Sequence, residues 1–280
     1  MIKRLWLISR PRFWMYFIGP YLIGIGAAQE FNFAIKENID ILWWLLFFSL
    51  PANLFVYGMN DIADSDTDMH NDKKGSYEIK VQKNEKRNVI IASILLMIPF
   101  VPLFFRASLY EQIALVVFIV FGLIYSLPPL RLKAIPFVDS LSNGVLYTMA
   151  GLMGYFASSG KEISVLPYTA AFLWASTMHA YSAIPDIEAD TKAGIKTIAT
   201  VLGQRNSILL CGFSYVLIAG MLVYSGYMYH ALLAIPYIVL ILLSLYKFKK
   251  QNNIFSIYKV YPYVTYVVGA LVYMITVNIK

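Results

Sequence analysis

The feature of this sequence that most constrains its fold is a series of nine apolar stretches, none of which contains Lys, Arg, Asp or Glu. Most of them approach the roughly 20 residues that a helix needs to cross a bilayer. They cover residues 13–28, 41–59, 89–105, 112–127, 140–157, 167–184, 207–225, 229–246 and 261–279. Lipid offers the backbone no hydrogen-bond partners, so helices are the economical structure for such stretches. The sequence therefore predicts an all-α, polytopic membrane protein with nine transmembrane helices around a central cavity, forming a single domain over residues 1–280.

The composition supports this interpretation. Hydrophobic residues make up 59% of the chain and charged residues only 14%, whereas soluble domains contain about 25% charged residues. The apolar content also excludes a disordered chain. Cys211 is the single cysteine, which excludes a disulfide framework. We expect the protein to be surrounded by membrane lipid.

The basic residues predict an orientation. The apolar run before Arg10 is too short for the core of a signal peptide, so we expect the first helix to be retained. If the N-terminus is cytoplasmic, 19 Lys and Arg lie on that side and 4 on the other, as the positive-inside rule requires. The net charge of +7 thus reflects membrane sidedness, and we expect no nucleic acid partner. The predicted location is the cell membrane.

Two acidic motifs follow apolar stretches on the predicted cytoplasmic side. The first contains Asn60, Asp64 and Asp68, and the second contains Asp186 and Asp190. Side chains four residues apart lie on one face of a helix, where like charges repel unless a cation offsets them. Both motifs therefore predict a bound cation.

The spacing of the motifs suggests a weak internal repeat, because Asp64 and Asp68 each precede their counterpart in the second motif by 122 residues. We expect the two motifs to face each other across the cavity, with Asp61 in support, and to bind Mg²⁺ through oxygen ligands. An EF-hand is excluded because Met69 and Gly75 occupy positions that need Gly and Glu. A solvated acidic loop is the simpler alternative, but it does not explain why the pattern occurs twice.

Basic residues accompany the acidic motifs in the sequence. Carboxylate-bound metal beside basic side chains suits a diphosphate, whose negative charge grows as its C–O bond breaks. Basic residues are also ordinary in any cytoplasmic loop. The diphosphate candidates are Lys74, Arg131, Lys133 and Lys196.

The two acidic motifs and the loop Tyr-Ser-x-Pro-Pro-x-Arg-Leu-Lys at residues 125–133 together resemble the UbiA-type intramembrane prenyltransferases. The resemblance covers at least residues 10–203. It implies a helical bundle that transfers a prenyl group from an allylic prenyl diphosphate, with Mg²⁺ between the two motifs. The sequence lacks the Tyr-x-x-x-Lys pattern of several relatives, because Pro129 stands four residues after Tyr125.

A narrower resemblance lies in the strings Ser-Arg-Pro-Arg-Phe-Trp at 9–14 and His-Ala-Tyr-Ser-Ala-Ile-Pro-Asp-Ile-Glu-Ala-Asp at 179–190. These strings are similar to the lycopene elongase branch of the family. That branch implies dimethylallyl diphosphate as donor and a carotenoid such as lycopene as the hydrophobic acceptor. A quinone precursor or another lipid remains an alternative acceptor, because it needs the same apolar cavity.

An allylic cation must be shielded from water, and aromatic faces attract cations. Aromatic residues in membrane helices also commonly serve packing alone. His179 lies within an apolar stretch, where a polar side chain faces either the bundle interior or a core partner. The candidates for the acceptor pocket are Trp14, Phe17, Tyr57, Tyr147, Tyr155, Trp174, His179 and Tyr181.

A cation transporter is the alternative from a different functional class. Transporter sites usually lie near the bilayer midplane, whereas both acidic motifs of this chain lie at the ends of apolar stretches. A non-catalytic lipid-binding scaffold does not explain why acidic and basic residues occur together. The sequence therefore favours a prenyltransferase.

Overall fold

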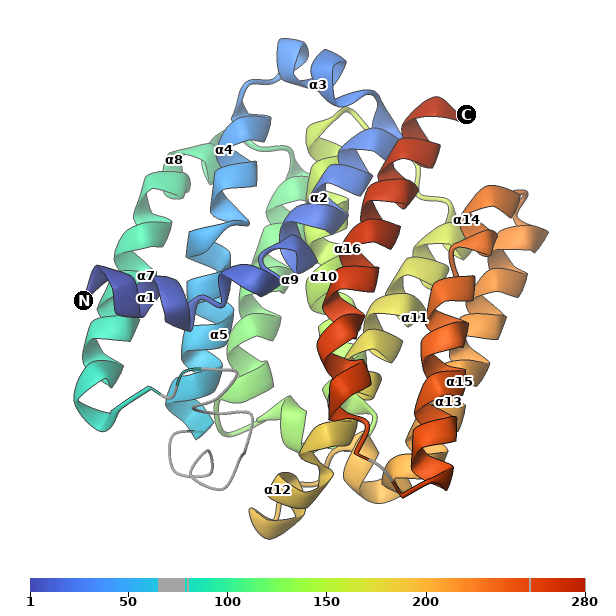
Figure 1. The fold of residues 1–280 in the computed structure, drawn as a ribbon. Helices are drawn as coiled ribbons and strands as arrows, with labels where there is room; N and C mark the ends of the chain where they lie inside the picture. Colours follow the sequence, from blue (N-terminus) through green and yellow to red (C-terminus); the bar gives the residue numbers. More distant parts are fainter. Residues whose placement is uncertain (65–78, 80, 252, 280) are drawn as a thin grey trace. The chain divides into compact units, whose positions relative to one another are not determined.

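The computed structural model describes residues 1–64, 79, 81–251 and 253–279 (Figure 1). Every regular element among these residues is a helix, as the sequence predicts. The chain divides into two compact units. Unit 1 consists of Met1–Arg131 and Met149–Lys161, and unit 2 consists of Leu132–Thr148 and Glu162–Lys280. The single domain over residues 1–280 stays a prediction.

Unit 1 contains the first acidic motif on α5. Its helices are α1 (Ile2–Ile8), η1 (Pro11–Phe13), α2 (Met15–Ala28), α3 (Phe31–Glu37), α4 (Asp40–Phe47), α5 (Leu50–Asp64), η3 (Lys83–Glu85), α7 (Lys86–Met97), η4 (Ile98–Phe100), α8 (Val101–Arg106) and α9 (Leu109–Ser126). Helix α1 crosses α5 in Figure 1. Ile8, Leu54 and Val89 form a small core that joins α1, α5 and α7.

Helix α2 packs very closely on the end of α10, whose residues from Met149 onward belong to unit 1. A Cβ atom added at Gly24 would lie 1.9 Å from the backbone oxygen of Gly151, and one at Gly154 would lie 2.0 Å from that of Tyr21. Glycine at these positions permits the two backbones to approach, as small residues do between membrane helices.

Unit 2 contains the second acidic motif on η6 and α12. Its helices are η5 (Leu132–Ala134), the first part of α10 (Val138–Ala157), α11 (Val165–Ser182), η6 (Ile184–Asp186), α12 (Ile187–Lys192), α13 (Ile198–Tyr224), α14 (Met228–Leu232), α15 (Ile235–Lys249) and α16 (Phe255–Asn278). Four buried tyrosines stack between α11, α13, α15 and α16. They are Tyr181, Tyr215, Tyr237 and Tyr261.

Six of the nine predicted spans coincide with long apolar segments in the described part of the chain, so this is an integral membrane protein. These segments are Asp40–Asp64, Lys83–Arg106, Leu109–Ser126, Ile198–Tyr224, Met228–Lys249 and Phe255–Asn278. The other three predicted spans coincide with α2, α10 and α11. α2 is shorter than the six, and α10 and α11 are less apolar because they contain buried polar residues such as Ser142, Asn143 and Thr177. The count of nine spans stays a prediction for these three helices.

Candidate active site

The first acidic motif lies at the end of α5. Asn60 and Asp64 lie one turn apart on the same face of this helix, and both are half-buried. The Oδ1 atom of Asn60 accepts a hydrogen bond of 3.2 Å from Ser126 Oγ, which ties the motif to the end of α9. Asp68 lies outside the described residues. The described part of this motif therefore presents two oxygen-bearing side chains on one helix face.

Asp61 is adjacent in sequence but has a different environment. Its side chain is fully buried, and its Oδ1 atom accepts a hydrogen bond of 2.6 Å from Arg10 Nη2. The guanidinium of Arg10 also lies over the ring of Tyr57, 4.8 Å from the centroid. A buried carboxylate needs such a partner, because an uncompensated charge in the protein interior is costly. The ion pair of Arg10 with Asp61 therefore holds the segment before α2 against α5.

Arg10 is a residue of this site that the sequence analysis missed. In the sequence it is one of several basic residues ahead of the first apolar stretch. In the structure it has a positive φ of 51°, immediately before η1. The signal in the sequence that could have revealed Arg10 was Asp61. A carboxylate next to the candidate metal ligands, but on another face of the helix, requires its own cation.

Arg131, one of the diphosphate candidates, is in contact with the first acidic motif. Its Nη2 atom donates a hydrogen bond of 3.1 Å to Asp64 Oδ1, although the two residues are 67 positions apart. Both side chains are partly buried. The backbone of Arg131 has a φ of 42°, in the left-handed region that non-glycine residues seldom adopt. The turn after α9 thus brings a guanidinium to the carboxylate face of α5.

The second acidic motif lies at the junction of η6 and α12 in unit 2. Asp186 ends η6 and Asp190 follows one turn later, and both are half-buried. Glu188, between them, is exposed and accepts a hydrogen bond of 2.7 Å from Lys192 Nζ. This lysine lowers the pKa of the Glu188 carboxyl. The motif thus separates into a half-buried pair, Asp186 and Asp190, and a solvated ion pair.

Asp139 connects α10 to the start of α13, which follows the second acidic motif. It lies in the first turn of α10, ahead of the apolar stretch 140–157, and is fully buried. Its Oδ2 atom accepts a hydrogen bond of 3.0 Å from the backbone N–H of Ile198, at the start of α13. Burial raises the pKa of the Asp139 carboxyl to about 6. Asp139 was not singled out in the sequence, where it is only one more acid on the predicted cytoplasmic side.

The remaining basic candidates have different environments. Lys133 lies in η5 of unit 2 and is buried. Lys196 lies between α12 and α13 and is exposed. Lys74 lies outside the described residues. Their contact with a diphosphate stays a prediction.

Three aromatic candidates in unit 1, Trp14, Phe17 and Tyr57, lie near the start of α2, whereas Tyr155 lies beside Gly24 farther along this helix. Phe17 is fully buried and meets Phe118 edge to face at a centroid distance of 5.1 Å. The indole N–H of Trp14 donates a hydrogen bond of 3.0 Å to the backbone oxygen of Ser9. Tyr57 and Tyr155 are half-buried. Membership of an acceptor pocket stays a prediction for all four candidates, Trp14, Phe17, Tyr57 and Tyr155.

The candidates in unit 2 divide between a buried stack and the contact of α10 with α11. Tyr181 is fully buried and stacks on Tyr261, and Trp174 meets Tyr237 edge to face. Tyr147 is buried on α10. The Nδ1 atom of His179 is paired with the Oγ atom of Ser140 at 3.2 Å. A role in the acceptor pocket stays a prediction for these four residues as well: Tyr147, Trp174, His179 and Tyr181.

The chemistry of each motif fits a hard divalent cation. Within the ranges that the structure describes, no group of three His, Cys, Asp or Glu side chains gathers to hold a metal ion. Each motif nevertheless offers two oxygen-bearing side chains, Asn60 with Asp64 and Asp186 with Asp190. Mg²⁺ is commonly held by a few carboxylates while substrate phosphates complete its coordination. A guanidinium already in contact with Asp64 adds the positive charge that a phosphate group requires.

Comparison with solved structures supports the fold. The structure of a UbiA homolog from Archaeoglobus fulgidus bound to DMAPP and Mg²⁺ matches with a TM-score of 0.70, over 99% of each chain. The sequence identity is 20%, so this likeness concerns the fold.

Comparison of the sequence identifies the family. A lycopene elongase/hydratase of Haloarcula japonica is 36% identical over 81% of this chain and 76% of its own length. A lycopene elongase/hydratase of Corynebacterium glutamicum is 34% identical over 78% of this chain and 76% of its own length. Residues 17–276 match the UbiA prenyltransferase family. The predicted resemblance is confirmed: this chain is a prenyltransferase and belongs to the UbiA family.

Proposed function

We propose that the protein transfers the dimethylallyl group of dimethylallyl diphosphate to a carotenoid such as lycopene. Relatives at 34–39% identity that carry the name lycopene elongase/hydratase support this acceptor. The Archaeoglobus homolog, which is bound to DMAPP and Mg²⁺, supports the donor. The observation on which the proposal depends most is the contact of Arg131 with Asp64 at the end of α5. It supports a role for Arg131 in binding phosphate beside a metal held by the first motif.

The metal ligands in this proposal are the side chains that share a helix face within each motif. They are Asn60, Asp64, Asp68, Asp186 and Asp190. Mg²⁺ held by these residues would offset the negative charge that grows on the diphosphate as the C–O bond breaks. Asp61 is engaged by Arg10 and is excluded from this set, because its role is to hold α5 in place.

The chain's own residues supply the remaining steps. Arg131 binds the diphosphate, with its planar guanidinium donating two hydrogen bonds to phosphate oxygens. Lys74, Lys133 and Lys196 add positive charge. The aromatic candidates shield the allylic cation from water and stabilise it through their ring faces by roughly 0.5–2 kcal/mol each.

The proposed topology has nine spans with the N-terminus in the cytoplasm. The 19 Lys and Arg on that side, against 4 on the other, support it. Both acidic motifs then belong to the cytoplasmic side of the cell membrane, where a water-soluble diphosphate is supplied. The acceptor dissolves in the bilayer and reaches the protein from the lipid.

A quinone precursor is the alternative acceptor, and one experiment separates the two. Purified protein in lipid nanodiscs is incubated with Mg²⁺ and labelled dimethylallyl, geranyl or geranylgeranyl diphosphate, against lycopene or a quinone precursor. We expect label to enter lycopene from dimethylallyl diphosphate. Transfer to the quinone precursor alone would overturn the carotenoid acceptor and leave the prenyltransferase class standing. Metal-driven cation flux without pyrophosphate release would favour the transporter alternative.

A further inference from the structure

Transfer of a prenyl group to an alkene leaves a proton to be removed. The C–O bond of the donor breaks with its electron pair leaving on the diphosphate, and the π electrons of the acceptor form the new C–C bond. A tertiary cation then remains on the acceptor. It is discharged when a neighbouring carbon loses a proton, or when water adds and the bound water loses one. Either route needs a base within reach of the acceptor, which is either the departing diphosphate or a side chain of the protein.

The contact of α10 with α11 holds one such base. His179 lies in the last turn of α11, half-buried, with Nδ1 3.2 Å from Ser140 Oγ in the first turns of α10. The two helices are in close contact at the next turn, where a Cβ added at Gly144 would lie 2.2 Å from Ser176 Oγ. The imidazole is therefore fixed against α10 by a polar contact and by tight packing beside it.

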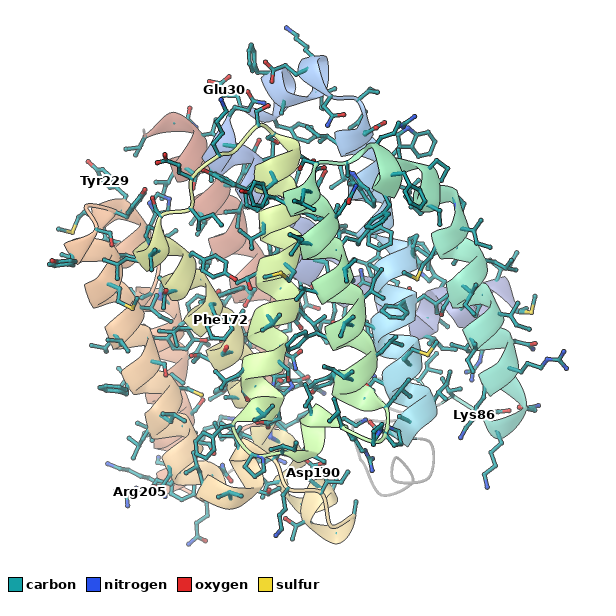
Figure 2. The ribbon with its side chains drawn as sticks, turned by 180° about the vertical axis from the view of Figure 1, so that it is seen from behind. Glu30, Lys86, Phe172, Asp190, Arg205 and Tyr229 are labelled. Atoms are coloured by element: carbon teal, nitrogen blue, oxygen red, sulfur yellow. The ribbon has the colours of Figure 1, made fainter. Side chains whose placement is uncertain are left out.

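The position of His179 relative to the second acidic motif follows from helix geometry. Asp186 follows His179 by seven positions, beyond the end of α11 and in the 3-10 helix η6, so the second acidic motif lies just past the end of α11 that carries His179. The rise over seven residues is about 10 Å. Figure 2 shows Asp190 and Arg205 at one end of unit 2 and Phe172 farther along α11, so His179 lies between the acidic end and the middle of the helix.

Three other ionisable side chains of unit 2 have partners of their own. Tyr181 is buried in the tyrosine stack and bonded to Ser244 Oγ at 2.7 Å. Asp139 accepts hydrogen bonds from the backbone N–H of Ile198 and from Ser140, which is also the partner of His179. Glu188 is exposed and paired with Lys192. The sequence of α11 contains no Lys, Arg, Asp or Glu, and His179 is its one histidine.

We propose that His179 is the catalytic base that accepts the proton released when the acceptor cation is discharged. This inference rests on the proposed function and adds a residue to it. In the required tautomer, Nδ1–H donates to Ser140 Oγ and Nε2 accepts the proton, either from a carbon next to the cation or from the water that adds to it. Ser140 is a positioning residue that selects this tautomer. The protonated imidazole then passes its proton to solvent.

The test compares His179→Gln with wild-type protein in nanodiscs, supplied with Mg²⁺, dimethylallyl diphosphate and lycopene. Pyrophosphate release and carotenoid products are measured separately, and ¹⁸O-water marks any alcohol formed. We expect His179→Gln to keep metal-dependent pyrophosphate release, with water capturing the prenyl group as prenyl alcohol. The yield of elongated carotenoid should fall by about a hundredfold, within the usual range for a general base. The ratio of alkene to alcohol among the remaining product changes as well.

The matched control is His230→Gln. His230 is also a half-buried histidine bonded to a hydroxyl, Thr276 Oγ1 at 2.9 Å, but it lies on α14, at the end of unit 2 opposite α12 (Figure 1). We expect this variant to keep the wild-type product yield and ratio. His179→Ala with added imidazole supplies a second readout, because recovery of carotenoid product by a diffusing base indicates proton transfer rather than packing.

The possible failures are distinguishable. Unchanged yield and ratio in His179→Gln, or loss of yield in His179→Ala that imidazole does not restore while pyrophosphate release persists, would overturn the role of His179 and leave the proposed function intact. Absence of pyrophosphate release from wild-type protein with every allylic donor would overturn the proposed function itself.

Discussion

Neighbouring residues of the first acidic motif have separate tasks because a helix turns by 100° per residue. Asn60 and Asp64 share one half-buried face, while Asp61 is fully buried against Arg10. The periodicity of the sequence was sufficient to separate the two faces. It carried no information about the partners, because Arg10 and Arg131 are 51 and 67 residues from the carboxylates that they contact. Such pairs depend on packing between distant segments.

The pairing of Arg10 with Asp61 predicts a large loss of stability in Arg10→Ala. The variant leaves a buried carboxylate without its cation, and we expect the free energy of unfolding in detergent to fall by about 3–5 kcal/mol. Arg4→Ala is the matched control, because Arg4 pairs with Glu85 at a more exposed position, and such pairs contribute about 0–1 kcal/mol. Equal thermal shifts in the two variants would contradict the structural role of Arg10.

Asp139 predicts a dependence of stability on pH. Its pKa of about 6 in the folded protein lies above the ordinary 3.8, so folding favours the protonated carboxyl. The associated stability is fully present below pH 4 and is lost as the pH rises through 6. Asp139→Asn does not titrate. We therefore expect its stability relative to wild type to increase between pH 4 and pH 7, by up to about 3 kcal/mol at 1.36 kcal/mol per unit.

Thermal unfolding across this pH range, in one detergent and at constant salt, measures the effect. A constant difference between Asp139→Asn and wild type from pH 4 to pH 7 would show that burial does not disfavour ionisation of this carboxyl.

At the scale of elements, charge-free length was enough to locate six long apolar segments of the described chain, because a charge is costly to bury in lipid whatever the rest of the fold. Local breaks were not predicted. The stretch 41–59 is interrupted between α4 and α5, and the stretch 89–105 contains η4 between α7 and α8, beside Pro99 and Pro102. The short helices α1 and α3 were also missed, because seven residues carry little periodic signal.

The contact of α2 with α10 gives a prediction for Gly24→Ala. The added methyl group meets the backbone oxygen of Gly151, which has no freedom to rotate away. We expect a loss of about 1–3 kcal/mol, as for other overpacked sites. Gly19→Ala on the same helix is the control, because nothing lies within 4 Å of its added Cβ, and alanine there should gain about 0.5–1 kcal/mol. Melting temperatures that shift alike in both variants would argue against the close contact.

At the scale of the whole molecule, each of the two units carries one acidic motif and its own aromatic core. The orientation in the membrane is predicted from charge, and labelling tests it. In a Cys211→Ala background, Lys161→Cys and Lys249→Cys place thiols on opposite predicted sides. Both positions are exposed. A membrane-impermeant maleimide should label position 161 in intact cells and position 249 only after disruption. The reverse pattern would invert the proposed topology.

The central claim is that both acidic motifs serve ionisation of an allylic diphosphate through a bound divalent metal. The most direct measurement is the rate of pyrophosphate release from dimethylallyl diphosphate by Asp64→Asn and Asp186→Asn, with and without Mg²⁺. Glu188→Gln is the control, because this carboxylate belongs to the second motif but is exposed and paired with Lys192. We predict that release by wild type and Glu188→Gln requires Mg²⁺, and that each Asp→Asn variant loses it while remaining folded. Full Mg²⁺-dependent release by either Asp→Asn variant would contradict the claim.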